Sequence, residues 1–308
     1  MTFISLLQAA ANAGGLPPGG ESLSLSDVVL EYLKFAGYFL AIGASAYRYF
    51  VLPRFEKGNA AVIGRRTAAT LGILGVFLLI VSALGGIELR ALSAHKPFTA
   101  SLPKAVGRFQ FQLIALAFSM AGYTIARRAS AVVGWPLAAI AILAVVLQPI
   151  YTARGFSGRV NAVHILAAST WLGTLTVMLF AGIRTLVSAP AGGSSRERAA
   201  ANIVNAFTPV ALTAASVLVI TGVTTAWLHV KRLSNLWGTD YGRALIVKLC
   251  FVLAVVVMGW WNWKRVKPSL TGGEESVARL NRSATTEVVL GAIVLAVTAV
   301  LVSLPSPR

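Results

Sequence analysis

Apolar runs of about 20 residues, separated by short polar loops, recur along the chain and constrain its fold more than any other feature. A helix of about 20 apolar residues crosses the ~30 Å hydrocarbon core of a bilayer. The alternating pattern of membrane-barrel strands is absent, so helices are the structure that satisfies every backbone polar group in lipid. The sequence therefore predicts an all-α polytopic membrane protein, a bundle of eight transmembrane helices. The expected spans are approximately 27–52, 67–89, 105–126, 130–151, 160–186, 202–229, 240–263 and 284–305.

Composition agrees with this class of protein. Of the 308 residues 56% are hydrophobic and only 12% are charged, and the mean hydropathy is +0.75. Soluble domains carry about twice that share of charged residues. We expect one transmembrane domain over residues 27–308, preceded by an N-terminal tail or interfacial segment over residues 1–26. The start of that segment has no Lys or Arg, so it lacks the basic region of a secretory signal peptide.

The formal net charge of +17 has a topological meaning here. Most Lys and Arg residues lie in the loops between apolar runs, so we expect membrane anchoring and no nucleic-acid partner. These residues are more numerous in loops that follow odd-numbered spans, and such loops face the cytoplasm by the positive-inside rule. Both termini are therefore expected on the outer side. Pro53, Pro190 and Pro268 follow odd-numbered spans and are expected to stop them.

The predicted topology places three scattered histidines on the outer side. His95 lies in the loop between the second and third spans, His164 about one turn inside the fifth span, and His229 at the end of the sixth. Glu31 and Lys34 lie one turn apart near the outer end of the first span. Ionisable groups within a span cost about 2.5 to 3.5 kcal/mol to insert and normally face a partner, water or a bundle interior. We infer an outward-opening polar pocket.

Three further polar groups lie within spans. Lys248 is two turns into the seventh span, and simple pairing of Glu31 with Lys34 or Lys248 is the structural alternative to the pocket. Glu287 lies one turn inside the inner end of the eighth span, where it would receive a cation or proton or simply hydrogen-bond Arg282 or a helix end. The single cysteine, Cys250, lies in an apolar run, so a disulfide framework is not expected.

The fifth span, RVNAVHILAASTWLGTLTVMLF, has a polar face. Asn161, His164, Ala168 and Trp171 recur at the 3, 4, 3 spacing of one side of a helix. A neutral imidazole is a common metal ligand and an axial ligand of haem, whereas a tryptophan packs as a wall. A satisfied structural histidine is the alternative interpretation. Nucleotide-binding glycine loops, HExxH and Ser-His-Asp sets are missing from the sequence, so we expect a protein that is not an enzyme.

Four blocks in order carry a family resemblance: VNAVHILAASTWLGTL, TGVTTAW, TDYGRALIVKL and RSATTEVVLGAIVLAVTAVLVSLPSP, together spanning about 159–306. With this order and spacing the chain resembles the copper resistance protein D family of bacterial inner-membrane proteins. The positions that match the family pattern are His164, Trp171, Gly173, Gly222, Tyr241, Gly242, Lys248, Glu287 and Pro305. Two positions depart from it: Thr174 replaces a glycine, and Ala206 replaces a basic residue before Phe207.

The resemblance implies an eight-span inner-membrane protein that moves copper from the periplasm toward the cytoplasm, often beside a periplasmic copper-binding protein. The termini, expected on the outer side from loop charge, would then be periplasmic. On this hypothesis His164 is the central ligand, His229 and His95 are entry ligands, Glu31 is an outer carboxylate and Glu287 serves the inner exit. Trp171, Tyr241 and Lys248 are pathway or structural residues.

Two other hypotheses stay open. In the first, the chain is a membrane redox protein that binds haem b, with His164 and His229 as axial ligands. In the second, it is a scaffold that docks a periplasmic copper chaperone.

Overall fold

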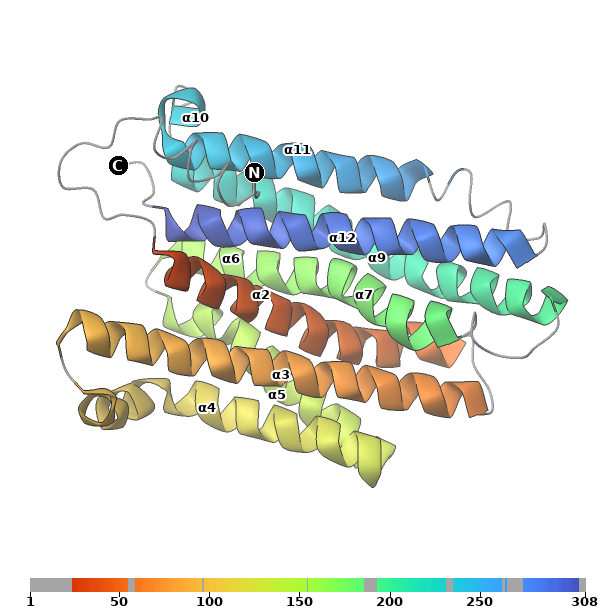
Figure 1. Cartoon of the computed structure of the whole chain (residues 1–308), viewed down its shortest axis with the longest axis horizontal. Helices are drawn as coiled ribbons and strands as arrows, with labels where there is room; N and C mark the ends of the chain where they lie inside the picture. The colour runs from red at the N-terminus through yellow and green to blue at the C-terminus, as the bar shows by residue number, and fades with distance from the viewer. Residues whose placement is uncertain are drawn as a thin grey trace.

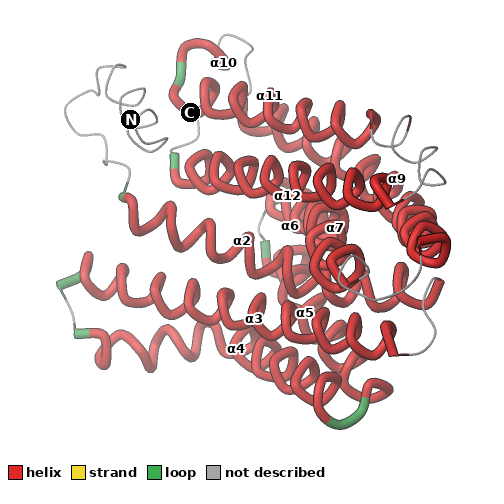
Figure 2. Tube along the Cα trace, turned by 45° about the vertical axis from the view of Figure 1, so that its right-hand side comes forward, coloured by secondary structure: helices red, strands yellow, loops and turns green. Residues whose placement is uncertain are grey.

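The described part of the chain is an assembly of long helices without strands, and eight of its helices are long and apolar enough to cross a membrane (Figures 1 and 2). The all-α polytopic bundle predicted from the sequence is confirmed. The computed structural model describes residues 24–54, 59–95, 97–153, 155–185, 193–230, 235–261, 264 and 274–304.

The first four spans are formed by α2 with two short terminal turns, and by α3, α4 and α5. Their bounds are α2 Leu25–Ala46, η1 Tyr47–Val51, η2 Leu52–Arg54, α3 Asn59–Ser93, α4 Phe98–Arg128 and α5 Ala131–Thr152. Pro53 lies in the 3-10 turn η2 that completes the first span, as predicted. Ser130 caps α5 by accepting a hydrogen bond from the Val133 amide.

The last four spans begin with a helix in which α-helical and π-helical segments alternate. This fifth span consists of α6 Phe156–Ala168, η3 Ser169–Gly173, α7 Thr174–Met178 and η4 Leu179–Ile183. The remaining elements are α9 Gly193–Val230, the short α10 Asn235–Gly238, α11 Asp240–Trp261 and α12 Glu274–Ser303. Pro190 and Pro268, two of the predicted stops, lie outside the described residues.

Successive spans run in opposite directions, so the start of α2 and the end of α12 lie at the same end of the bundle (Figure 1). This agrees with termini on one side of a membrane, while the choice of the outer side stays a prediction from loop charge. In Figure 1, α3, α4 and α5 lie on one side of α2, and α9, α11 and α12 lie on the other. The first span is therefore central.

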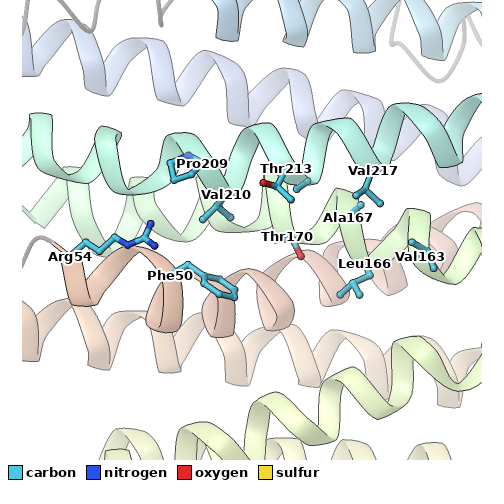
Figure 3. Close-up of a pocket in the computed structure, with 11 residues that line it drawn as sticks. Phe50, Arg54, Val163, Leu166, Ala167, Thr170, Pro209, Val210, Thr213 and Val217 are labelled. Atoms are coloured by element: carbon cyan, nitrogen blue, oxygen red, sulfur yellow. The ribbon is translucent and has the colours of Figure 1, made fainter.

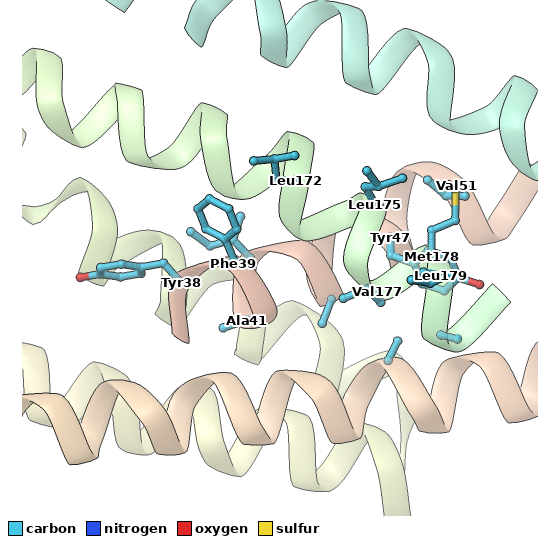
Figure 4. Close-up of a cluster of buried hydrophobic side chains, with 14 of the residues drawn as sticks. Tyr38, Phe39, Ala41, Tyr47, Val51, Leu172, Leu175, Val177, Met178 and Leu179 are labelled. Atoms are coloured by element: carbon cyan, nitrogen blue, oxygen red, sulfur yellow. The ribbon is translucent and has the colours of Figure 1, made fainter. Parts of the chain in front are cut away.

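The core joins α2 to the fifth span. Figure 4 shows Phe39 and Tyr47 of α2–η1 beside Leu172, Leu175 and Met178 of the fifth span, all of them buried. The approach is closest at two glycines. A Cβ on Gly43 would overlap the Gly173 backbone, and a Cβ on Gly173 would overlap the carbonyl of Phe39. Small residues let membrane helices pack backbone against backbone, and this contact fixes the fifth span against α2.

The spans of the described structure include the π-helical turns η1, η3 and η4. The sequence pattern did not predict them. A π-turn adds a residue to the helical turn and is frequent at functional sites. Two of the three lie in the fifth span, directly after the segment that carries His164.

Candidate functional site

His164 is half-buried on α6 and contacts α9 directly. Its Nδ1 atom lies 3.0 Å from the hydroxyl oxygen of Thr221. The residue that the sequence singled out is therefore held by the sixth span.

The hydrogen bonds of Thr221 settle which ring nitrogen is protonated. Its hydroxyl lies 2.7 Å from the Val217 carbonyl and 3.2 Å from that of Leu218, within its own helix. A hydroxyl has one hydrogen to donate, and here it goes to the backbone. The oxygen must then accept from His164, so Nδ1 carries the ring hydrogen. The Nε2 atom keeps its lone pair, which is the form of imidazole that binds a metal.

Gly222 has no side chain, and this leaves space for the imidazole of His164. A Cβ at this position would lie 3.2 Å from Cε1 of His164 and 3.7 Å from its Nδ1. A side chain here would press on the ring edge that faces α9. The glycine that matches the family pattern is thus explained by the fit of His164.

Lys248 brings a third helix to the site. It is half-buried on α11, and its charge acts electrostatically on the His164 imidazole. A cation bound by His164 would be repelled by an ammonium group in this surrounding of low dielectric constant. Lys248 therefore works against tight binding of a metal ion.

A groove runs between α6 and α9 from this site toward the end of the first span. Its volume is about 400 Å³, and Figure 3 shows Val163 and Val217 at one end and Arg54 at the other. The Nη1 atom of Arg54 donates to the Ala206 carbonyl at 3.5 Å. Most of the lining is apolar, with the hydroxyls of two threonines: Phe50, Arg54, Val163, Leu166, Ala167, Thr170, Pro209, Val210, Thr213, Ala214 and Val217.

No described contact joins His164 to Glu31 or His95, two of the other predicted outer ligands. Glu31 forms an ion pair with Lys34 at 2.5 Å, which is the structural alternative considered for this carboxylate. His95 is exposed in the turn after α3, with a positive φ of 52°. His229 follows Thr221 by eight residues on α9, about 12 Å further along the helix axis.

The described residues contain no group of three or more His, Cys, Asp or Glu side chains arranged to hold a metal ion. The side chain of His229 is outside the described set. The polar pocket inferred from topology is therefore, within the described structure, a pairwise contact of His164 with α9 near Lys248. The site-residue assignments remain predictions.

The remaining predicted residues lie in the bundle interior. Trp171 is in the π-turn η3 and packs against the main buried cluster, and Tyr241 forms a smaller cluster with Leu245 and Leu301. Glu287 is 8% exposed on α12. Its neighbour one turn on, Gly291, packs against Leu172 of the fifth span.

Sequence reasoning missed three polar groups. Thr221 holds His164, and its only sequence signal was its place before Gly222 in the block TGVTTAW. Ser169 and Thr174 are fully buried at the two ends of η3, and their hydroxyls have no hydrogen-bond partner in the described structure. Thr174 stands where the family pattern has a glycine. The region around the π-turn therefore holds polar groups that an apolar core does not require.

Comparison with known proteins concerns the part of the chain that contains α9, α11 and α12. Residues 201–301 match the sequence model of the family Copper resistance protein D. The match covers about a third of the chain. The resemblance predicted from the sequence is confirmed here, over α9 to α12, and the match includes Thr221, Lys248 and Glu287. His164 precedes it on the chain and reaches it through Thr221.

A curated relative extends the comparison. The Copper transport protein CutJ of Bacillus subtilis (strain 168) is 27% identical over 144 residues, 47% of this chain and 24% of the relative. The matched region thus spans about a quarter of that protein's length. A search of solved structures found no match.

Proposed function

We propose that this chain handles copper in the bacterial inner membrane and transports copper ions from the periplasm toward the cytoplasm, with His164 as the central ligand. The observation that carries the proposal is the Thr221 hydrogen bond, which leaves Nε2 of His164 with a free lone pair. The match to the copper resistance protein D family and the name of the curated relative support copper as the cargo.

A site of few ligands suits a transporter better than a storage protein. A full set of tight ligands would trap the ion, whereas one imidazole opposed by Lys248 binds it weakly enough to release it. In this proposal His95, His229 and Glu31 act in succession as entry ligands. Copper is supplied by a periplasmic copper-binding protein, and the chain catalyses no chemical reaction.

The inner half of the path would end at Glu287. Leu172 lies eight residues beyond His164, and Gly291, which packs against Leu172, lies one turn beyond Glu287. His164 and Glu287 are therefore separated by about 18 Å along the bundle axis. Leu172 is buried between these levels, so passage of an ion requires the helices to rearrange.

Copper uptake into proteoliposomes tests the proposal. The His164→Ala variant is expected to lose uptake and to bind less copper by elemental analysis, while His164→Gln keeps similar bulk and shows whether packing alone is at stake. Thermal stability of each variant in detergent checks that it is folded. Retained uptake together with retained copper binding would sink the assignment. Copper binding near zero in the parent protein, with an intact periplasmic partner complex, would favour the scaffold.

Haem b is the second candidate, because the apolar groove between α6 and α9 begins beside His164. The described residues that line it include no histidine and no methionine, so His164 would have to reach the groove from its edge. The register on α9 also separates His229 from Thr221 by about 12 Å. An optical spectrum of the purified protein decides between the two: a Soret band that His164→Ala removes supports haem, and a colourless protein with bound copper supports transport.

A further inference from the structure

A second site lies away from His164, where α3 begins and α4 ends. Three arginines, Arg66 of α3 with Arg127 and Arg128 of α4, line a pocket of about 340 Å³. All three side chains are exposed. The described lining of this pocket consists of positively charged residues alone.

The two helices that line this pocket carry few carboxylates. The sequence has no Asp or Glu between Glu88 and Glu197, a stretch that includes all of α4 and α5. Glu88 itself lies near the far end of α3. Among the described residues, none of the three arginines takes part in an ion pair. The protein therefore leaves this cluster of charges uncompensated within its described part.

Helix dipoles explain only part of the cluster. The negative end of α4 stabilises Arg127 and Arg128. Arg66 lies two turns from the N-terminal, positive end of α3, so the helix dipole does not stabilise its charge. Three guanidinium groups that converge on one pocket repel one another, and a bound anion would remove that repulsion. Guanidinium groups also form the paired hydrogen bonds that phosphate oxygens accept.

Apolar tracks lead from the pocket along both helices. On α3, Leu74 and Phe77 follow Arg66 at intervals of eight and eleven residues, on the same helix face, and are 44% and 53% exposed. On α4, Ile114 precedes Arg128 by fourteen residues, again on one face, and is 48% exposed. The spans Val62–Ser93 and Phe109–Arg128 place the arginines at the membrane boundary and these side chains within the hydrocarbon region.

We propose that this corner binds an anionic phospholipid. Its phosphate is held by Arg66, Arg127 and Arg128, and its acyl chains lie along the exposed apolar faces of α3 and α4. Basic pockets between transmembrane helices on the cytoplasmic side bind anionic lipid headgroups. The loop charge predicts that this end of the bundle faces the cytoplasm. The site is separate from His164 and does not depend on copper transport.

Native mass spectrometry of the detergent-purified full chain, titrated with phosphatidylglycerol or with phosphatidylcholine of the same acyl chains, tests the proposal. We expect phosphatidylglycerol to bind more tightly. Removing one arginine, in Arg66→Gln, should weaken its binding about fivefold, and Arg127→Gln/Arg128→Gln should weaken it about 25-fold. Arg66→Lys keeps the charge but loses the planar fork and should lie between Arg66→Gln and the parent.

Arg65→Gln is the matched control, because it removes a neighbouring charge from the same end of α3 outside the pocket. It should bind phosphatidylglycerol like the parent. Equal losses in Arg65→Gln and Arg66→Gln, or equal affinity for the two lipids, would overturn the proposal. If inorganic phosphate occupies the pocket and phosphatidylglycerol does not displace it, the ligand is free phosphate and the lipid proposal is overturned. Thermal stability without added lipid shows whether each variant is folded.

Discussion

The two sides of the fifth span differ in how they meet their neighbours. Toward α2 the contact is backbone against backbone at Gly43 and Gly173, and the two spans are 50% and 61% buried. Toward α9 the contact is a hydrogen bond beside an open groove, and the α9 span is only 17% buried. The α11 span, which carries Lys248, is 11% buried. The fifth span thus packs backbone against backbone on one side, and on the other, here called the loosely held side, it faces helices that are themselves mostly unburied within the described bundle.

This difference separates stability from function. A substitution at the α2 contact has no space to relax into, so it should act on folding. A substitution of a polar group at the α9 contact changes hydrogen-bonding and charged groups, so it should act on ligand binding. The proposed central ligand lies on the loosely held side, next to helices that are mostly unburied within the described bundle.

The largest effect is expected at Gly173. In Gly173→Ala the new methyl group would overlap the Phe39 carbonyl, and we expect a loss of about 3 kcal/mol in stability, the upper end for overpacked sites. Gly259→Ala on α11 is the matched control, because nothing lies within 4 Å of its Cβ position. Thermal unfolding in detergent followed by size exclusion measures both. Equal melting temperatures for the two variants would contradict the proposal that the α2 contact of the fifth span controls stability.

The next effect tests the loosely held side. Thr221→Val removes the acceptor for Nδ1 of His164 at nearly constant shape, and we expect copper affinity to fall about 10- to 100-fold, as when a ligand loses its orienting partner. Thr221→Ser keeps the hydroxyl and should keep most of the affinity. Competition with a chelator measures copper affinity, and melting temperatures should stay near that of the parent. A Val variant with unchanged affinity contradicts the role given to Thr221.

These contrasts also mark what the sequence could predict. The eight spans were predictable because lipid imposes the length and polarity of each helix, and Pro53 gave a visible stop. The π-turns were not, because their hydrophobic pattern is the same as that of an α-helix. The partner of His164 was not predictable either: the block TGVTTAW offers Thr221, Thr224 and Thr225, and only the packing of α6 on α9 selects among them.

A smaller effect of opposite sign is expected at Lys248. Its charge repels a cation at His164, so Lys248→Met should tighten copper binding by about three- to tenfold. Uptake should slow at the same time, because the ion leaves its ligand less readily. Arg243→Gln, on the same helix and exposed, is a control for loss of a positive charge near the membrane boundary. Weaker copper binding in Lys248→Met would show that the lysine supports the site through packing.

The smallest effect is expected at His95, because it lies in the turn after α3 and the described contacts bring no other predicted ligand to it. Its φ of 52° is tolerated by asparagine, so His95→Asn removes the imidazole without straining the turn. As an entry ligand distant from His164, it should change equilibrium copper affinity by less than about twofold, since distant sites act independently. Uptake at low copper concentration should fall while uptake at saturation is kept. A loss of affinity as large as that of Thr221→Val would mean that the α3–α4 turn closes over the site and that the loosely held side extends across the bundle.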